Sequence, residues 1–80
     1  MHPALSWVTE RLPNLREKVA RLFDQSEDFR EICEEYQACC EALVRLAPPG
    51  SDEAVRREYV ALRLRLEGEM LRYVAEHPDA

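Results

Sequence analysis

The residues of this chain best suited to chemistry are three cysteines, Cys33, Cys39 and Cys40. If they lie on one helix, Cys33 and Cys40 share a face but are separated by ~10 Å along its axis, too far for a disulfide or for one metal ion. Cys39 and Cys40 point in different directions, and no C-x-x-C pattern occurs. We therefore expect buried, apolar cysteines, with a disulfide between two subunits in oxidised samples as the alternative.

Acidic side chains form the second group, in the segment that also holds the cysteines. Metal sites built from carboxylates in helical bundles also use a histidine three residues after a glutamate (E-x-x-H). No acidic residue of this segment has a histidine at that spacing, because His2 and His77 lie at the two ends of the sequence. We expect no metal ion and no cofactor. The acidic residues predict a solvated face, which consists of Glu27, Asp28, Glu31, Glu34 and Glu35. Glu69 lies on the helix beside the apolar residues Leu66, Met70 and Tyr73, where we expect it to pair with an arginine.

Motifs of enzymes do not occur in this sequence: it has no G-x-S-x-G, no P-loop, no dinucleotide-binding fingerprint and no discernible catalytic triad. A small helical protein of this kind also encloses little space for a substrate. We expect a protein that is not an enzyme and has no catalytic residue.

Two segments, 27–47 and 52–76, carry apolar residues at every third or fourth position, which is typical of amphipathic helices. They flank Pro48-Pro49-Gly50, so residues 48–51 predict a turn. Because neither helix can bury its stripe alone, we expect an antiparallel helical hairpin. Its expected core consists of Phe29, Ile32, Tyr36 and Leu43 with Val55, Tyr59, Leu62, Leu66, Met70 and Tyr73.

Residues 3–23 predict short helical segments before the hairpin. Pro3 suits a first helical turn, and Pro13 interrupts the helix because it lacks an amide donor. Asp24 or Ser26 is expected to cap the next helix. The whole chain, 1–80, is predicted to be one all-α domain.

The second long segment has an additional apolar face, nearly opposite its stripe, formed by Val60, Leu64 and Leu71. A helix that is apolar on two sides has two partners. The alternatives are the N-terminal segment with Trp7, a second copy of the chain, and an unidentified protein. Since 80 residues supply a limited core, we expect a homodimer that forms a four-helix bundle.

The net charge of −5 argues against a nucleic-acid partner, which selects basic surfaces. No apolar stretch approaches the ~20 residues that span a bilayer, so we expect no membrane partner. An odd number of cysteines without a signal peptide indicates a reducing cytoplasm. Acids prevail from Asp24 to Glu41 and arginines from Ala54 to Val74, an arrangement that suits attraction between antiparallel helices.

Three stretches resemble the small bacterial YdcH-like family, whose function is unknown. The stretch from Leu12 to Val19, LPNLREKV, is similar to the family's F-P-E-[FL]-R-E-K-I opening. Residues 29–46 are similar to its F-x-x-L-F-D-E-Y-H-x-L-D-x-E-I segment, and Ser51-Asp52-Glu53 followed by residues 63–70, RLRLEGEM, to its R-L-x-L-K-D-E-L ending. The resemblance implies a self-associating helical hairpin without known activity. The chain departs from the family at polar positions, namely Gln37, Cys40, Gly68, Val60 and Ala61.

The expected function is therefore a cytoplasmic module for protein–protein interaction and self-association. One alternative is an adaptor that presents the acidic face to a basic partner, which salt would weaken. The other is a redox-responsive regulator that uses Cys33, Cys39 and Cys40.

Overall fold

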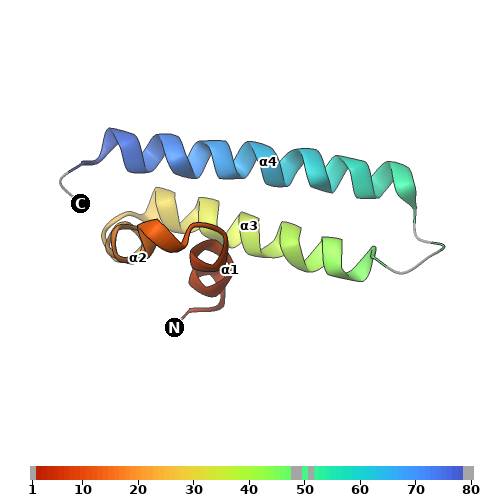
Figure 1. Cartoon of the computed structure of the whole chain (residues 1–80), viewed down its shortest axis with the longest axis horizontal. Helices are drawn as coiled ribbons and strands as arrows, with labels where there is room; N and C mark the ends of the chain where they lie inside the picture. Colours follow the sequence, from red (N-terminus) through yellow and green to blue (C-terminus); the bar gives the residue numbers. More distant parts are fainter. Residues whose placement is uncertain (1, 48–49, 51, 79–80) are drawn as a thin grey trace.

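The computed structural model describes residues 2–47, 50 and 52–78, and within these ranges it contains helices and no strand. The helices are α1 (Pro3–Arg11), α2 (Arg16–Gln25), α3 (Glu27–Arg45) and α4 (Glu53–Glu76), and a short 3₁₀ turn, Pro13–Leu15, joins α1 to α2 (Figure 1). The prediction of an all-α fold is confirmed.

Side chains at the helix starts explain several of these boundaries. The Ser26 hydroxyl accepts a hydrogen bond from the Phe29 amide at 3.1 Å, while the Ser26 amide donates to the Leu22 carbonyl. One serine thus ends α2 and begins α3. At α4, the Asp52 carboxylate accepts from the amides of Ala54 and Val55. Such caps satisfy amides that have no partner within the helix.

The boundaries differ from the predicted ones by a few residues. Helix α3 ends at Arg45 rather than at residue 47, since the Ala47 amide bonds the Val44 carbonyl in a tighter turn. Helix α2 continues to Gln25, so Asp24 lies inside it and the cap is Ser26 alone. In the predicted turn, Pro48, Pro49 and Ser51 lie outside the described residues, and Gly50 has a φ of 91°, which favours glycine.

Helices α3 and α4 lie side by side along their length and run in opposite directions (Figure 1). At one end, the Ser26 and Tyr73 hydroxyls share a hydrogen bond. Toward the other end, the Cys39 thiol donates to the Tyr59 carbonyl at 3.1 Å. These two contacts fix which turns of the two helices are adjacent.

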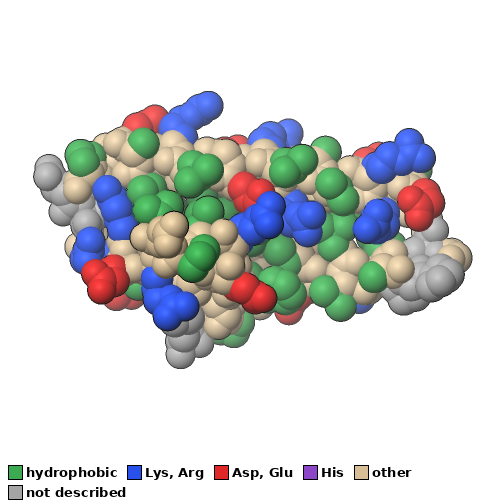
Figure 2. Space-filling model, viewed as in Figure 1, with side chains coloured by type: hydrophobic (Ala, Val, Ile, Leu, Met, Phe, Trp, Pro, Cys, Tyr) green, Lys and Arg blue, Asp and Glu red, His purple; other side chains and the backbone are tan. Residues whose placement is uncertain are grey.

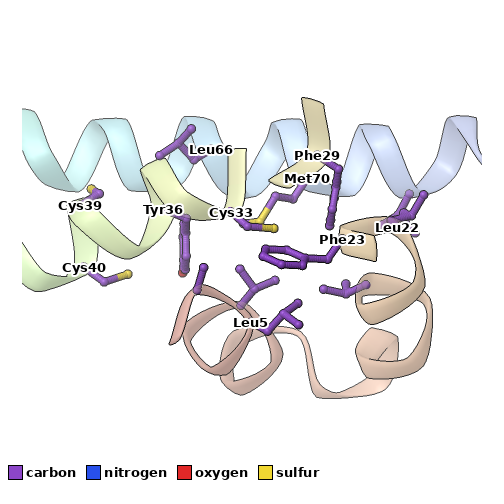
Figure 3. Close-up of a cluster of buried hydrophobic side chains, with 14 of the residues drawn as sticks. Leu5, Leu22, Phe23, Phe29, Cys33, Tyr36, Cys39, Cys40, Leu66 and Met70 are labelled. Carbon is purple, nitrogen blue, oxygen red and sulfur yellow. The ribbon is translucent and has the colours of Figure 1, made fainter. Parts of the chain in front are cut away.

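Helices α1 and α2 pack on α3 and cover the half of it that begins at Glu27 (Figure 1). Helix α3 therefore has neighbours on two sides. Between them lies a cluster of buried side chains, in which Phe23 points toward Cys33 and Met70 (Figure 3). Val8 and Val19 are completely buried there.

Candidate interaction surface

The predicted hairpin residues are unequally buried. Phe29, Tyr36, Leu43, Leu66 and Met70 are buried in the core. Half-buried positions are held by Ile32, Val55, Tyr59, Leu62 and Tyr73. The contribution of the N-terminal helices to the core was not predicted, because a short segment carries too few turns for a clear apolar period.

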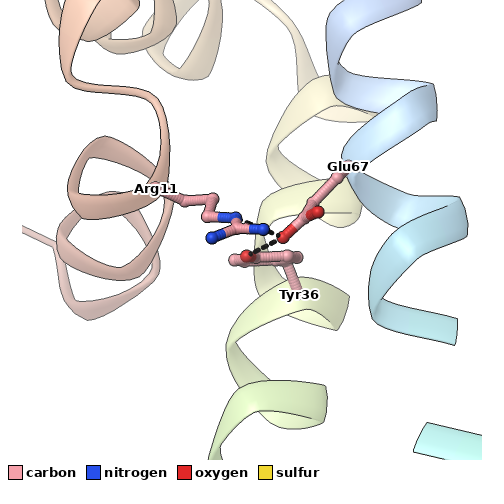
Figure 4. Close-up of polar contacts among 3 residues, drawn as sticks. All are labelled: Arg11, Tyr36 and Glu67. Carbon is pink, nitrogen blue, oxygen red and sulfur yellow. Dashed lines mark hydrogen bonds and ion pairs between the residues drawn. The ribbon is translucent and has the colours of Figure 1, made fainter. Parts of the chain in front are cut away.

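Glu67 of α4 is the polar side chain on which three helices converge (Figure 4). Its Oε2 accepts a hydrogen bond from the Tyr36 hydroxyl of α3 at 2.6 Å and from Arg11 Nε of α1 at 3.0 Å. The Glu67 side chain is 12% exposed, while that of Arg11 is 59% exposed. The carboxylate thus holds α1 against the pair of long helices.

The surroundings of Tyr36 keep its hydroxyl protonated. Burial raises the pKa of Tyr36 far above its usual value, and the hydrogen bond to the Glu67 carboxylate raises it further, because a phenolate could not donate that bond. Tyr36 is therefore a permanent donor to Glu67. The sequence predicted Tyr36 on the apolar stripe and an ion pair at Glu69, and it predicted no role for Glu67. Glu69 is exposed, and the ion pair belongs to Glu67.

All three cysteines are free and buried. Burial raises the pKa of the Cys33 thiol to about 12, with the nearby Glu34 carboxylate as a smaller cause. Burial is also the largest cause of the raised pKa values of Cys39 and Cys40. Since the thiolate is the reactive form, these thiols are poor nucleophiles at neutral pH.

A cavity of about 290 Å³ opens where α1, α3 and α4 meet, and Trp7, Tyr36, Cys40 and Arg63 contribute to its wall. Arg63 Nε is buried beside it without a hydrogen-bond acceptor among the described residues. A larger open hollow of about 750 Å³ lies at the C-terminal end of α4, where the His77 ring stacks on Tyr73.

The residues of the predicted second apolar face of α4 differ in their burial. Val60 and Trp7 are half-buried and pack against the core, whereas Leu64 and Leu71 are 57% and 46% exposed. Helix α1 packs on α3, so the N-terminal segment does not cover Leu64 and Leu71. The physical reason is that α3, rather than α4, presents a second buried face, which includes Cys33 and Cys40.

Charged side chains remain largely unpaired on the described surface. Within residues 2–47, 50 and 52–78, one ion pair occurs, between Arg11 and Glu67. The predicted attraction along the edges of the two long helices is therefore not realised as ion pairs. All five acids of the predicted acidic face are exposed. Figure 2 shows charged groups scattered over one face, with hydrophobic side chains between them along α3 and α4.

Comparisons of the chain with models of protein families, with curated proteins and with solved structures find no match. In the described part of the chain, no three side chains of His, Cys, Asp or Glu are placed to hold a metal ion. Among the same residues, no helix has the combined length and apolar character needed to cross a membrane.

Proposed function

We propose that this protein is a non-enzymatic interaction module that self-associates as a homodimer. In this proposal α3 and α4 act as an antiparallel helical hairpin, and the long helices of two copies join in a four-helix arrangement. The observation that carries the proposal is the exposure of Leu64 and Leu71, two large apolar side chains on the outer side of the longest helix.

Single exposed leucines are common on monomers, but these two are related by position. They lie seven residues apart, so they share one side of α4 about 10 Å apart along its axis. Full burial of an exposed leucine side chain contributes about 1.5–3 kcal/mol, and each of these two, which are 57% and 46% exposed, has a part of that left to gain. A contact that buries both residues in each of two copies therefore gains free energy that the monomer leaves unused.

Size-exclusion chromatography with light scattering tests this proposal on the full chain. We expect a mass that rises toward that of a dimer as the loaded concentration increases. A mass equal to one chain at every concentration, for a protein that circular dichroism shows to be folded, contradicts self-association.

The exposed acidic face of α3 favours a second candidate, an adaptor that binds a basic partner protein. Glu27, Asp28, Glu31, Glu34 and Glu35 lack ion-pair partners among the described residues. Binding through this face would weaken steeply with added salt, because exposed charges are screened over about 8–10 Å at physiological ionic strength. Charge-reversed variants of Glu31 and Glu35 would lower the affinity while leaving the homodimer intact.

The burial and the raised pKa values of Cys33, Cys39 and Cys40 weigh against the redox-responsive regulator. Membership of the YdcH-like family also stays a proposal, supported by the three motif stretches and by the two long helices that carry the last two of them.

A further inference from the structure

The outer side of α4 carries a seam of small and large apolar residues with the spacing of a coiled coil. At 100° per residue, its members lie within about 80° of the helix circumference. The spacings alternate between three and four residues, as at the a and d positions of a heptad. We name this set the outer seam, and it consists of Ala61, Leu64, Gly68, Leu71 and Ala75, all exposed.

Gly68 is a feature of the seam that the single chain does not explain. Glycine in a helix interior is less favourable than alanine, because it loses more backbone freedom on folding. A Cβ added at Gly68 would meet no atom within 4 Å, so nothing in the chain requires its absence. Space for a methyl group is available there, and a glycine allows another molecule to approach this turn closely.

On the basis of the proposed self-association, we propose that α4 of a second copy packs antiparallel on the outer seam. The twofold axis crosses the interface at the level of residue 66 along the helix. This register places each leucine opposite a small residue. Leu64 faces Gly68 of the second copy, and Leu71 faces Ala61 of the second copy. The twofold symmetry makes each of these contacts occur twice in the dimer. Large side chains that pack into the spaces left by small ones allow two helices to approach closely.

Two charged residues beside the seam, Glu58 and Arg72, favour the second copy as the occupant and the antiparallel direction. In this register Glu58 of one chain lies beside Arg72 of the other, twice by symmetry. Both residues are exposed, and neither has an ion pair among the described residues. A parallel pair would instead place Glu58 beside Glu53 of the second copy, which is repulsive. The two Arg65 side chains flank the twofold axis, where each has Glu69 one turn along its own helix.

The test measures dimer dissociation by sedimentation equilibrium for the full chain and three single variants. Leu64→Gln and Leu71→Gln should each raise the Kd at least about tenfold, since every substitution occurs twice in the dimer. The control is Val44→Gln, which replaces a side chain that is 62% exposed on α3 and should leave the Kd unchanged. Because all three residues are exposed, the folded monomer tolerates these changes, which circular dichroism checks.

A charge swap tests the direction. Glu58→Arg and Arg72→Glu should each weaken the dimer, and the double variant should recover most of the affinity. A double variant no tighter than the single ones overturns the antiparallel register. A wild-type dimer that tolerates Leu64→Gln and Leu71→Gln overturns the outer seam but leaves self-association standing. A wild-type chain that stays monomeric overturns both.

Discussion

At the scale of single residues, the hydrogen bond between Tyr36 and Glu67 joins the two long helices. The Glu67 side chain is 12% exposed and accepts a hydrogen bond from the Tyr36 hydroxyl at 2.6 Å. Arg11 supplies the positive charge from the surface side. A partly buried carboxylate needs such partners, because an unpaired charge in this position is costly.

Replacement of Tyr36 by phenylalanine should therefore destabilise the fold. The change removes one hydrogen bond to a charged group, and we expect a loss of about 1.5–3 kcal/mol in the free energy of unfolding. Urea denaturation followed by circular dichroism measures it. Tyr59→Phe is the matched control, because the Tyr59 hydroxyl makes no hydrogen bond among the described residues. Equal losses in the two variants would contradict the role assigned to Tyr36.

The buried thiols should make the fold sensitive to alkaline pH. The Cys33 thiol of the folded chain keeps its proton up to a pKa of about 12, whereas an exposed thiol in the unfolded chain loses it near pH 9. The contribution of the protonated Cys33 thiol to the free energy of unfolding is therefore complete below pH 9. It is lost as the pH rises toward 12, because the unfolded state then binds fewer protons than the folded state. For one thiol the loss is about 1.4 kcal/mol per pH unit in this window.

Urea denaturation at several pH values checks this prediction. Between about pH 9 and about pH 10.5, the free energy of unfolding should fall less steeply for Cys33→Ala than for the wild type. Cys39, Cys40 and Tyr36 have raised pKa values as well, so part of the slope should remain in the variant. Identical slopes would show that Cys33 is not held in its protonated form by the fold.

At the scale of elements, periodicity predicted the two long helices well and their neighbours poorly. The stripe that contains Phe29, Tyr36, Leu66 and Met70 follows from local spacing, and these four side chains are buried. The docking of α1 on α3 follows from tertiary packing, which no local pattern encodes. The neighbours of α3 on two sides were therefore not predicted, because the contacts of α1 and α2 with α3 depend on the whole fold.

The same reasoning explains which polar features could be predicted. Ser26 was one of two candidate caps because serine before an acidic helix start is a local signal. Glu67 has no such signal, since its partners lie 31 and 56 residues away in the sequence. A carboxylate next to an apolar stripe suggests an ion pair, but only the packing of three helices decides between Glu67 and Glu69.

Replacement of Gly68 by alanine should separate the stability of the helix from that of the dimer. In the monomer the added methyl meets open space, and the better helix propensity should raise the free energy of unfolding by up to about 1 kcal/mol. In the dimer the same methyl would meet Leu64 of the second copy and weaken association. Urea denaturation at low protein concentration and sedimentation at high concentration measure the two effects. A tighter dimer would contradict a close approach at Gly68.

At the scale of the whole molecule, the chain buries its core on one side of α4 and leaves two large apolar side chains exposed on the other. Helices α1, α2 and α3 gather on the first side (Figure 1). Leu64 and Leu71 lie on the second side, where they are exposed and no described residue buries them. In the proposed dimer, a second copy would cover this side of α4 without a change in the fold of either chain, since the residues of the outer seam are already exposed.

Sedimentation equilibrium of the unmodified chain, from low micromolar to submillimolar concentration, tests this central claim most directly. We expect the weight-average mass to rise from the 9.3 kDa of one chain toward twice that value and to follow a monomer–dimer equilibrium. A mass that stays at 9.3 kDa over the whole range would contradict the account.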